Sequence, residues 1–180
     1  YLRFAKACEP YCTPYSRWGE VKEDSNITEE LRQEAQRRYA STKIPFLKLR
    51  YAYQLVRLAQ FHQQYDDAIR YYHKYAKPVL WASKEIGAWV TGNYAGCLRQ
   101  KKRYAEAAYA FSREYASAPS RQIEARWGWK INNDKQWNQL MALCKNDREK
   151  ADNHALRAFS LHAIPYDDIR MMQQLDPGRE

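Results

Sequence analysis

The side chains in this sequence that could carry out acid–base chemistry are two pairs of neighbouring carboxylates. Asp66-Asp67 and Asp167-Asp168 are of the residue type that general acid–base catalysis uses. Each pair, however, stands where a helix is expected to begin, and acidic side chains in a first helical turn cap the helix and complement its dipole. We therefore expect both pairs to stabilise helices rather than to act on a substrate.

The histidines form no recognisable metal-binding or catalytic motif. None of the four lies in an HExxH pattern or in a defensible His/Asp/Ser arrangement. His154 and His162 are eight residues apart, which would place them two turns apart on one helix, poorly placed to share a metal ion. A glycine-rich phosphate-binding loop is also missing. The sequence therefore predicts no metal, no cofactor and no catalytic residue.

The four cysteines also lack a motif. Cys8 and Cys12 stand four residues apart in a segment broken by proline, and they have neither CxxC nor zinc-finger spacing. Cys97 and Cys144 fall on apolar helix positions, which favours buried free thiols. A reactive thiol pair at Cys8 and Cys12 is the one enzymatic alternative, and a thiol titration tests it.

The composition predicts an all-α protein. The 180 residues suit one domain with a sizeable core. Helix formers dominate, Gly is scarce at 6 residues, and the alternating Val/Ile/Thr runs that indicate strands are missing. No apolar run approaches the roughly 20 residues of a transmembrane helix, and no signal peptide is visible. Because the first residue is Tyr1 rather than Met, we expect a processed product or part of a longer protein.

Hydrophobic spacing and helix-start signals predict a series of amphipathic helices. After a short first helix and an irregular segment up to residue 24, the expected helices cover residues 25–41, 45–64, 65–78, 85–102 and 103–119. These helices would have to position any functional surface, because no isolated motif does so.

The later helix of each predicted pair repeats one pattern, in which a large residue is followed by Ala or Leu and then by an aromatic residue or Cys. The pattern occupies Tyr65, Ala68 and Tyr72, then Tyr104, Ala107 and Phe111, then Trp137, Leu140 and Cys144. Its middle positions are 39 and 33 residues apart. Each copy is preceded by a pair of residues in which a large residue is followed, in most cases, by a small one. These pairs are Leu55-Val56, Tyr94-Ala95 and Trp127-Gly128.

This pattern resembles the tetratricopeptide repeat, a helix-turn-helix unit of about 34 residues. Trp127-Gly128 matches its first-helix signature best, and Ala107, Phe111 and Pro119 match its second-helix signature best. In such a unit the small residues let two helices approach closely, and the aromatic residues fill the space to the next unit.

The resemblance implies an all-α fold of antiparallel helix pairs stacked in a right-handed α-solenoid. Three pairs and a degenerate fourth, capping unit would cover residues 45–177. Residues 1–44 would supply an irregular segment and an N-terminal capping helix of the same continuous domain. The first unit departs most from the pattern, since Val56 replaces the small residue and its closing Pro78 comes early.

In tetratricopeptide-like arrays the first helices line a concave groove. The repeat frame places eight candidate partner-binding residues there: Arg50, Tyr53, Arg57, Trp89, Asn93, Arg99, Arg126 and Trp129. Arg and aromatic residues are favoured at protein contacts, and Arg can grip a carboxylate with two hydrogen bonds. Only Asn93 and Arg126 could correspond to the groove residues with which family members clamp a terminal carboxylate, so that clamp is not expected.

The sequence thus predicts a non-enzymatic scaffold that binds a protein or peptide through a basic, aromatic groove. The net charge of +9 and the pI of about 9.4 suit an acidic partner. A nucleic-acid-binding helical repeat is the alternative, and a merely basic surface is the simplest explanation of the charge, since the cations form no block or arm. Binding to nucleic acid would weaken steeply with salt, which separates the two functions.

Overall fold

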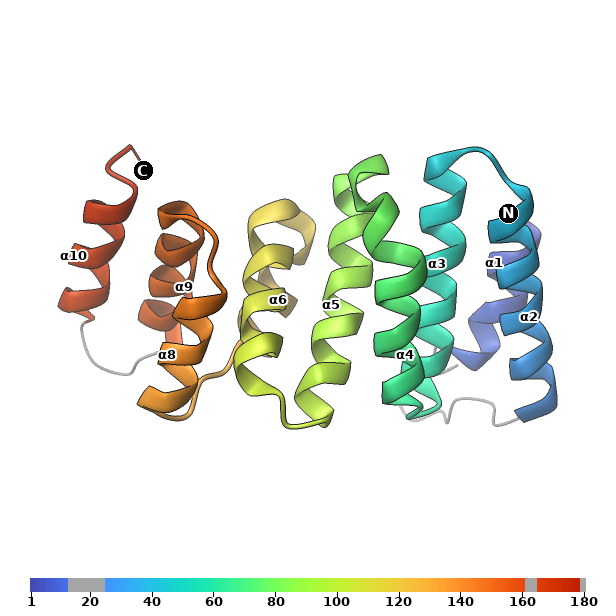
Figure 1. Ribbon diagram of the computed structural model, residues 1–180, viewed down its shortest axis with the longest axis horizontal. Coiled ribbons are helices and arrows are strands. Elements are labelled where there is room, and N and C mark those ends of the chain that lie inside the picture. The colour runs from blue at the N-terminus through green and yellow to red at the C-terminus, as the bar shows by residue number, and fades with distance from the viewer. Residues whose placement is uncertain (13–24, 161–164, 179–180) are drawn as a thin grey trace.

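Every regular element is helical in the computed structural model, which describes residues 1–12, 25–160 and 165–178. The helices stand side by side in a row, and the N-terminus and the C-terminal end lie at opposite ends of that row (Figure 1). No strand occurs among the described residues. The all-α prediction is therefore confirmed.

The α-helices are α1 (Leu2–Cys8), α2 (Ser25–Ser41), α3 (Pro45–Phe61), α4 (Tyr65–Tyr71), α5 (Lys84–Gln100), α6 (Tyr104–Ser117), α7 (Gln122–Gly128), α8 (Asp134–Leu143), α9 (Asp147–Ser160) and α10 (Tyr166–Leu175). The short elements are η1 (Glu9–Tyr11), η2 (Tyr72–Ala76), η3 (Lys77–Ala82) and η4 (Pro119–Arg121). Helices are thus present in each range that the sequence predicted, and the predicted irregular segment lies partly outside the described residues, at 13–24.

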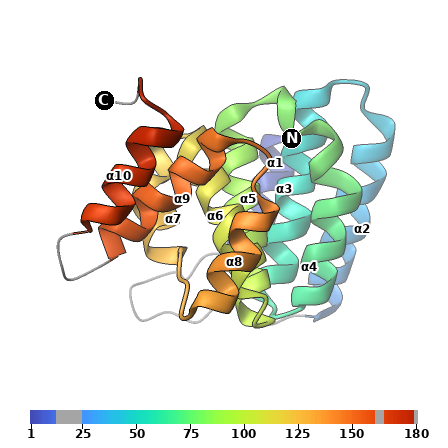
Figure 2. The same cartoon turned by 60° about the vertical axis from the view of Figure 1, so that its left-hand side comes forward.

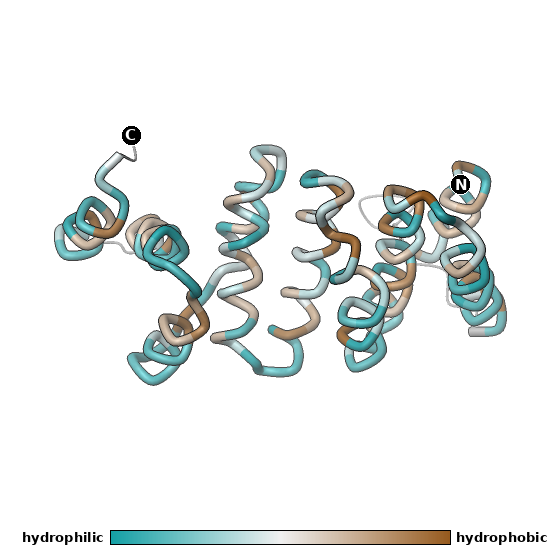
Figure 3. The backbone as a smooth tube through the Cα atoms, turned by 45° about the horizontal axis from the view of Figure 1, so that its top comes forward, coloured by the Kyte–Doolittle hydropathy of each residue, from teal (hydrophilic) through white to brown (hydrophobic). Residues whose placement is uncertain are grey.

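The core is built around α3 and α5. Leu49, Leu55 and Leu58 of α3 and Leu98 of α5 are fully buried. Hydrophobic stretches recur along these inner helices, whereas the connection between α5 and α6 is hydrophilic (Figure 3). Ser83 caps α5 by accepting a hydrogen bond from the backbone N–H of Ile86, which satisfies one of the unpaired donors of the first turn.

The small residues of the sequence pattern, Ala68, Ala95 and Ala107, are buried. Gly128 lies directly against the Phe111 ring, with no room for a side-chain carbon between them. The aromatic position of the second pair thus contacts the next helix along the chain.

Two helix connections have the same backbone turn. Gln63, after α3, and Lys102, after α5, have positive φ values of 58° and 60° and are 39 residues apart. In each turn this residue donates its N–H to the carbonyl three residues earlier, and the next residue donates to the carbonyl five residues earlier. This is the Schellman pattern of helix ends. The two turns have the same spacing as the first two copies of the sequence pattern.

The second helix of the first pair is irregular and longer than the sequence suggested. After Tyr71 it changes to the π-helical turn η2 and then to the 3-10 helix η3, which ends at Ala82. Pro78 stands in the first turn of η3, where its missing N–H leaves no backbone bond unmade. Pro78 therefore does not end the helical segment, which continues to Ala82. These additional residues explain the 39-residue spacing between the first two copies of the sequence pattern.

The third predicted pair differs most from a regular repeat. The helices α7 and α8 are short, and both pack against α6 rather than mainly against each other; they are well separated in Figure 2. Trp127 is 78% exposed, so the large residue of its signature pair does not pack between helices. Trp129, two residues later in the chain, is the buried tryptophan of this helix pair.

Candidate functional site

The predicted groove residues of α3 contact the N-terminal segment. The Arg50 guanidinium lies over the Tyr1 ring, 4.6 Å from its centroid. Arg57 donates a hydrogen bond of 3.2 Å to the carbonyl oxygen of Cys12. Tyr53 is partly buried against the core, so this part of the predicted groove packs against the protein's own first residues.

The predicted residues of α5 are partly engaged with neighbouring helices. Trp89 lies next to Tyr53, with the ring centroids 6.0 Å apart, and its Nε1–H donates to Glu85. The Asn93 amide nitrogen is buried without a hydrogen-bond partner among the described residues. Arg99 is exposed, and its guanidinium lies over an aromatic ring of α6.

The predicted residues of α7 have different environments. The exposed Arg126 lies over the Phe159 ring, 5.3 Å from its centroid. Trp129 is buried, and its Nε1–H donates to Asn153 over 3.0 Å. The structure thus brings Tyr53 and Trp89 together but engages most of the eight residues in internal contacts. Their role in partner binding stays a prediction.

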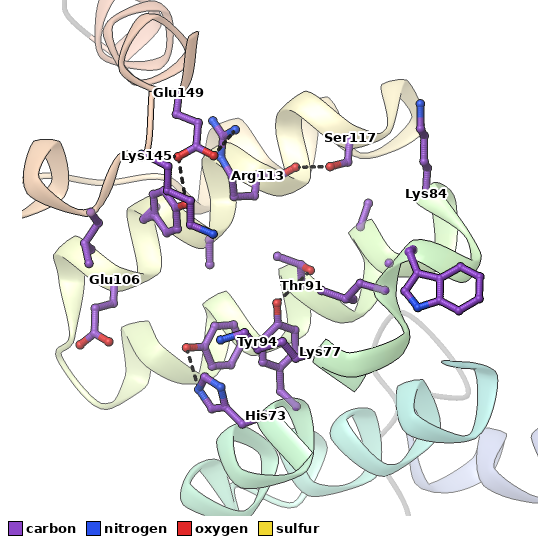
Figure 4. A pocket seen from close by; sticks show the side chains of 18 residues that line it. His73, Lys77, Lys84, Thr91, Tyr94, Glu106, Arg113, Ser117, Lys145 and Glu149 are labelled. Atoms are coloured by element: carbon purple, nitrogen blue, oxygen red, sulfur yellow. Dashed lines mark hydrogen bonds and ion pairs between the residues drawn. The ribbon is translucent and has the colours of Figure 1, made fainter. Parts of the chain in front are cut away.

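A pocket of about 640 Å³ opens on a different set of residues. It lies between η2 and η3, α5, α6 and the start of α9 (Figure 4). Its lining includes four small residues of the two central helices, Gly87, Ala88, Thr91 and Ala110. Because these side chains are short, they leave a hollow that the longer side chains of the flanking helices surround.

One wall of the pocket is a stack of tyrosines. Tyr72 and Tyr94 lie parallel with their centroids 3.9 Å apart. The Tyr94 hydroxyl is 3.2 Å from His73 Nε2, and Tyr72 is hydrogen-bonded to Thr91. Burial raises the pKa of Tyr94 to about 12 and lowers the pKa of His73, with the positive charge of Lys77 adding to the effect. At neutral pH this wall therefore offers uncharged hydrogen-bonding groups.

The facing wall is a polar cluster that joins α6 to α9. Arg113 pairs with Asp152 at 2.6 Å and with Glu149 at 3.5 Å. Glu149 also accepts hydrogen bonds from the Tyr109 hydroxyl and from the backbone N–H of Lys145. Arg113 therefore offsets part of the negative charge of the two carboxylates on this side of the pocket.

Three lysines around the pocket form no ion pair among the described residues. They are Lys77, Lys84 and Lys145. Lys145 lies on the α6–α9 side, Lys77 near the tyrosine wall and Lys84 at the far end (Figure 4). The remaining carboxylate of the lining, Glu106, pairs with Arg103. The pocket therefore has excess positive charge over a largely apolar lining.

The cysteines are free thiols in environments that disfavour the reactive thiolate. Burial raises the pKa of Cys8, Cys12 and Cys97 to about 12, and the proximity of Cys12 contributes to the rise for Cys8. Cys144 is half-buried, and burial raises its pKa too. Thiolates are the nucleophilic form, and the effect of burial outweighs that of Arg57, whose charge lowers the pKa of both Cys8 and Cys12.

One His–Asp pair was not anticipated from the sequence. His154 Nδ1 lies 2.7 Å from Asp168, and both side chains are buried. Asp168 also pairs with Arg157 at 3.1 Å. Because Asp168 is on α10 and the other two residues are on α9, the cluster fastens the last helix to its neighbour. Asp168 stands in the first turn of α10, as expected, but it contacts α9 instead of capping its own helix.

The other acidic pair also makes ordinary helix-surface contacts. Asp66 and Asp67 stand in the first turn of α4, and they pair with Lys101 and Arg70 respectively. Within the described residues, no group of three or more His, Cys, Asp and Glu side chains is arranged to hold a metal ion. His162 lies outside the described residues.

Comparisons with known proteins provide no match. No protein-family model matches the sequence, and neither a curated protein nor a solved structure matches it. None of the helices in the described part of the chain is long and apolar enough to cross a membrane.

The repeat pattern singled out Trp89, Asn93 and Arg99 on α5, whereas other residues of the same helix line the pocket: Lys84, Gly87, Ala88, Thr91 and Tyr94. Half of the tyrosine wall comes from η2 and half from α5, and η3 adds Lys77, Leu80 and Trp81 to the lining. The 39-residue spacing was the signal that could have found them. A π-helical turn such as η2 frequently marks a functional site.

Proposed function

We propose that this protein is a non-enzymatic, tetratricopeptide-like scaffold that binds an acidic segment of a partner protein. The small residues at the helix crossings and the equivalent turns at Gln63 and Lys102 support the repeat arrangement. Stacked helix pairs bury a continuous core and leave an extended surface for binding. The right-handed solenoid belongs to this proposal.

The observation that carries the proposal is the excess of lysine around the pocket. Lys77, Lys84 and Lys145 would gain ion pairs from an acidic ligand, because no carboxylate among the described residues pairs with them. The apolar floor would contact an apolar side chain of the same ligand. A cavity of about 640 Å³ falls within the usual range of ligand sites. The exposed indole of Trp81 at its edge is a residue type enriched at protein contacts.

A charge-reversal experiment tests this function. The wild type, Lys77→Glu/Lys145→Glu and the control Lys43→Glu/Lys130→Glu are immobilised and exposed to a nuclease-treated lysate, and the retained proteins are quantified. The control lysines are exposed and form no ion pair among the described residues, so the net charge changes equally in both variants. For proteins that the wild type retains, we expect the retained amount to be about tenfold lower on the pocket variant and unchanged on the control. Equal retention by all three proteins would rule out the pocket as the partner site.

Nucleic acid is the second candidate function. The observation in its favour is the net charge of +9, together with the exposed Trp81 and Trp127 side chains, which could stack on bases. Titrations of single- and double-stranded RNA and DNA over a range of salt concentrations test it. Phosphate contacts require a steep loss of affinity with salt, and a shallow dependence would exclude this function.

A further inference from the structure

A second pocket adjoins the one described above. It has a volume of about 650 Å³ and lies between the start of α6 and α8. Glu106 and Leu143 line both pockets. The two linings are therefore adjacent, and together they include residues of α6 from Tyr104 at one end to Ser117 at the other.

The second pocket has the same charge character as the first. Its lining includes Lys102 and Lys135, neither of which forms an ion pair among the described residues. Arg103 also lines it and is occupied by Glu106 through contacts of 2.5 and 2.8 Å. Asn133 and Gln136 add neutral amides. The excess positive charge thus continues along the whole of α6.

We propose that the two pockets form one groove that binds an extended acidic polypeptide segment along α6. The inference rests on the proposed function and adds the path, the length and the chemistry of the ligand. A helix of 14 residues is about 21 Å long, and an extended chain rises about 3.3 Å per residue. The groove therefore accommodates about six residues.

The lining favours a polypeptide over a nucleic acid. Apolar side chains such as Leu80, Ala110 and Leu143 line the groove together with the lysines, whereas interfaces with nucleic acid are more polar and more strongly basic. Glu106 and Glu149 also face the groove. They would repel a continuous row of phosphates more strongly than a peptide with a carboxylate at every second residue, and they can accept hydrogen bonds from peptide N–H groups. An extended peptide can point its carboxylates at the lysines and its apolar side chains at the floor, because alternate side chains point in opposite directions.

Fluorescence anisotropy tests the groove. The probe is a fluorescein-labelled pool of peptides about eight residues long, with Asp at alternate positions and random residues between them. A pool with Asn in place of Asp, a pool half as long and a single-stranded RNA of equal charge serve as comparisons. The proteins are the wild type, Lys77→Glu/Lys145→Glu, Lys102→Glu/Lys135→Glu and the control Lys43→Glu/Lys130→Glu. Circular dichroism and a thermal melt establish that each variant folds.

We expect the acidic pool to bind the wild type and the control alike and to bind each groove variant about tenfold more weakly. The Asn pool should bind weakly to all four proteins. The binding of the shorter pool should be strongly weakened by only one of the two groove variants. If only Lys77→Glu/Lys145→Glu weakens binding, the continuous groove is wrong while the proposed function stands. If neither variant weakens it, or if no acidic pool binds at about 1 mM, both fail. If the RNA binds more tightly than the acidic pool, and if both groove variants weaken RNA binding, the proposal that the ligand is a peptide is wrong.

Discussion

At the level of single residues, the most unusual environment belongs to Glu114. Its side chain is fully buried in α6, Arg121 pairs with one carboxylate oxygen at 2.9 Å, and the other oxygen has no hydrogen-bond partner among the described residues. Burial raises the pKa of Glu114 from 4.5 to about 7, although Arg121 acts in the opposite direction. A buried charge that is only half satisfied favours its neutral form.

This environment predicts a pH-dependent stability. The folded state holds the Glu114 proton more tightly than the unfolded state, so the stabilisation is fully present below pH 4.5 and is lost as the pH rises to about 7. The difference between the folded-state and unfolded-state pKa of Glu114 lowers the free energy of unfolding by about 3 kcal/mol over this pH interval. We expect Glu114→Gln to remove this component of the pH dependence. Urea unfolding of both proteins between these pH values measures it, since the other carboxylates contribute equally to both. Parallel stability curves would contradict the prediction.

At the level of helices, α5 and α6 approach closely because α5 has no side chain at the crossing. A side-chain carbon at Gly92 would collide with the Glu114 carboxylate. The same carbon at Gly96 would meet only the end of the flexible Gln60 side chain, at 3.1 Å. The two glycines, one turn apart, therefore have different roles.

Alanine substitutions at these glycines should have different effects. Both gain about 1 kcal/mol from helix propensity. We expect Gly92→Ala nevertheless to destabilise the protein by about 1–3 kcal/mol, because Glu114 is buried and held by Arg121 and cannot move aside. Gly96→Ala serves as the matched control and should leave stability unchanged or raise it by up to about 1 kcal/mol. Chemical unfolding measures both, and equal effects would show that the contact with Glu114 does not limit the crossing.

The sequence is sufficient to predict the structural features that local hydrophobic patterning determines. Helix positions and small crossing residues such as Ala68 and Ala107 follow from hydrophobic spacing, because burial selects residue types at helical intervals. The path of the chain after Tyr71 could not be predicted, since a π-helical turn has no distinct hydrophobic period. The pocket was missed for a related reason: its lysines become neighbours only through packing. The His154–Asp168 pair likewise joins two helices that no local pattern connects.

At the level of the whole molecule, the buried residues are unevenly distributed. Among the described residues, most members of the hydrophobic core cluster precede residue 112, and only Trp129, Leu140 and Leu156 follow it. The later helices are joined to α6 by these few apolar residues and by polar contacts. Asn153 of α9 accepts from Trp129 and donates to Ser112 of α6. Buried polar networks stabilise packing only while every member is satisfied.

We therefore expect the C-terminal helices to open before the core does. In native-state hydrogen exchange, the amides of α3 and α5 should be the most protected, and those of α8 and α10 should exchange through a partial opening of lower free energy. Trp129→Phe keeps the apolar ring but removes the N–H, which deprives the buried Asn153 oxygen of its donor at a cost of about 1–3 kcal/mol. This substitution should accelerate exchange in α9 and α10 while α3 and α5 change little. Trp127→Phe, at an exposed position two residues earlier, is the control and should alter neither region. Uniform acceleration along the chain after Trp129→Phe would show instead that the helices unfold as one cooperative unit, with Trp129 contributing equally to all of them.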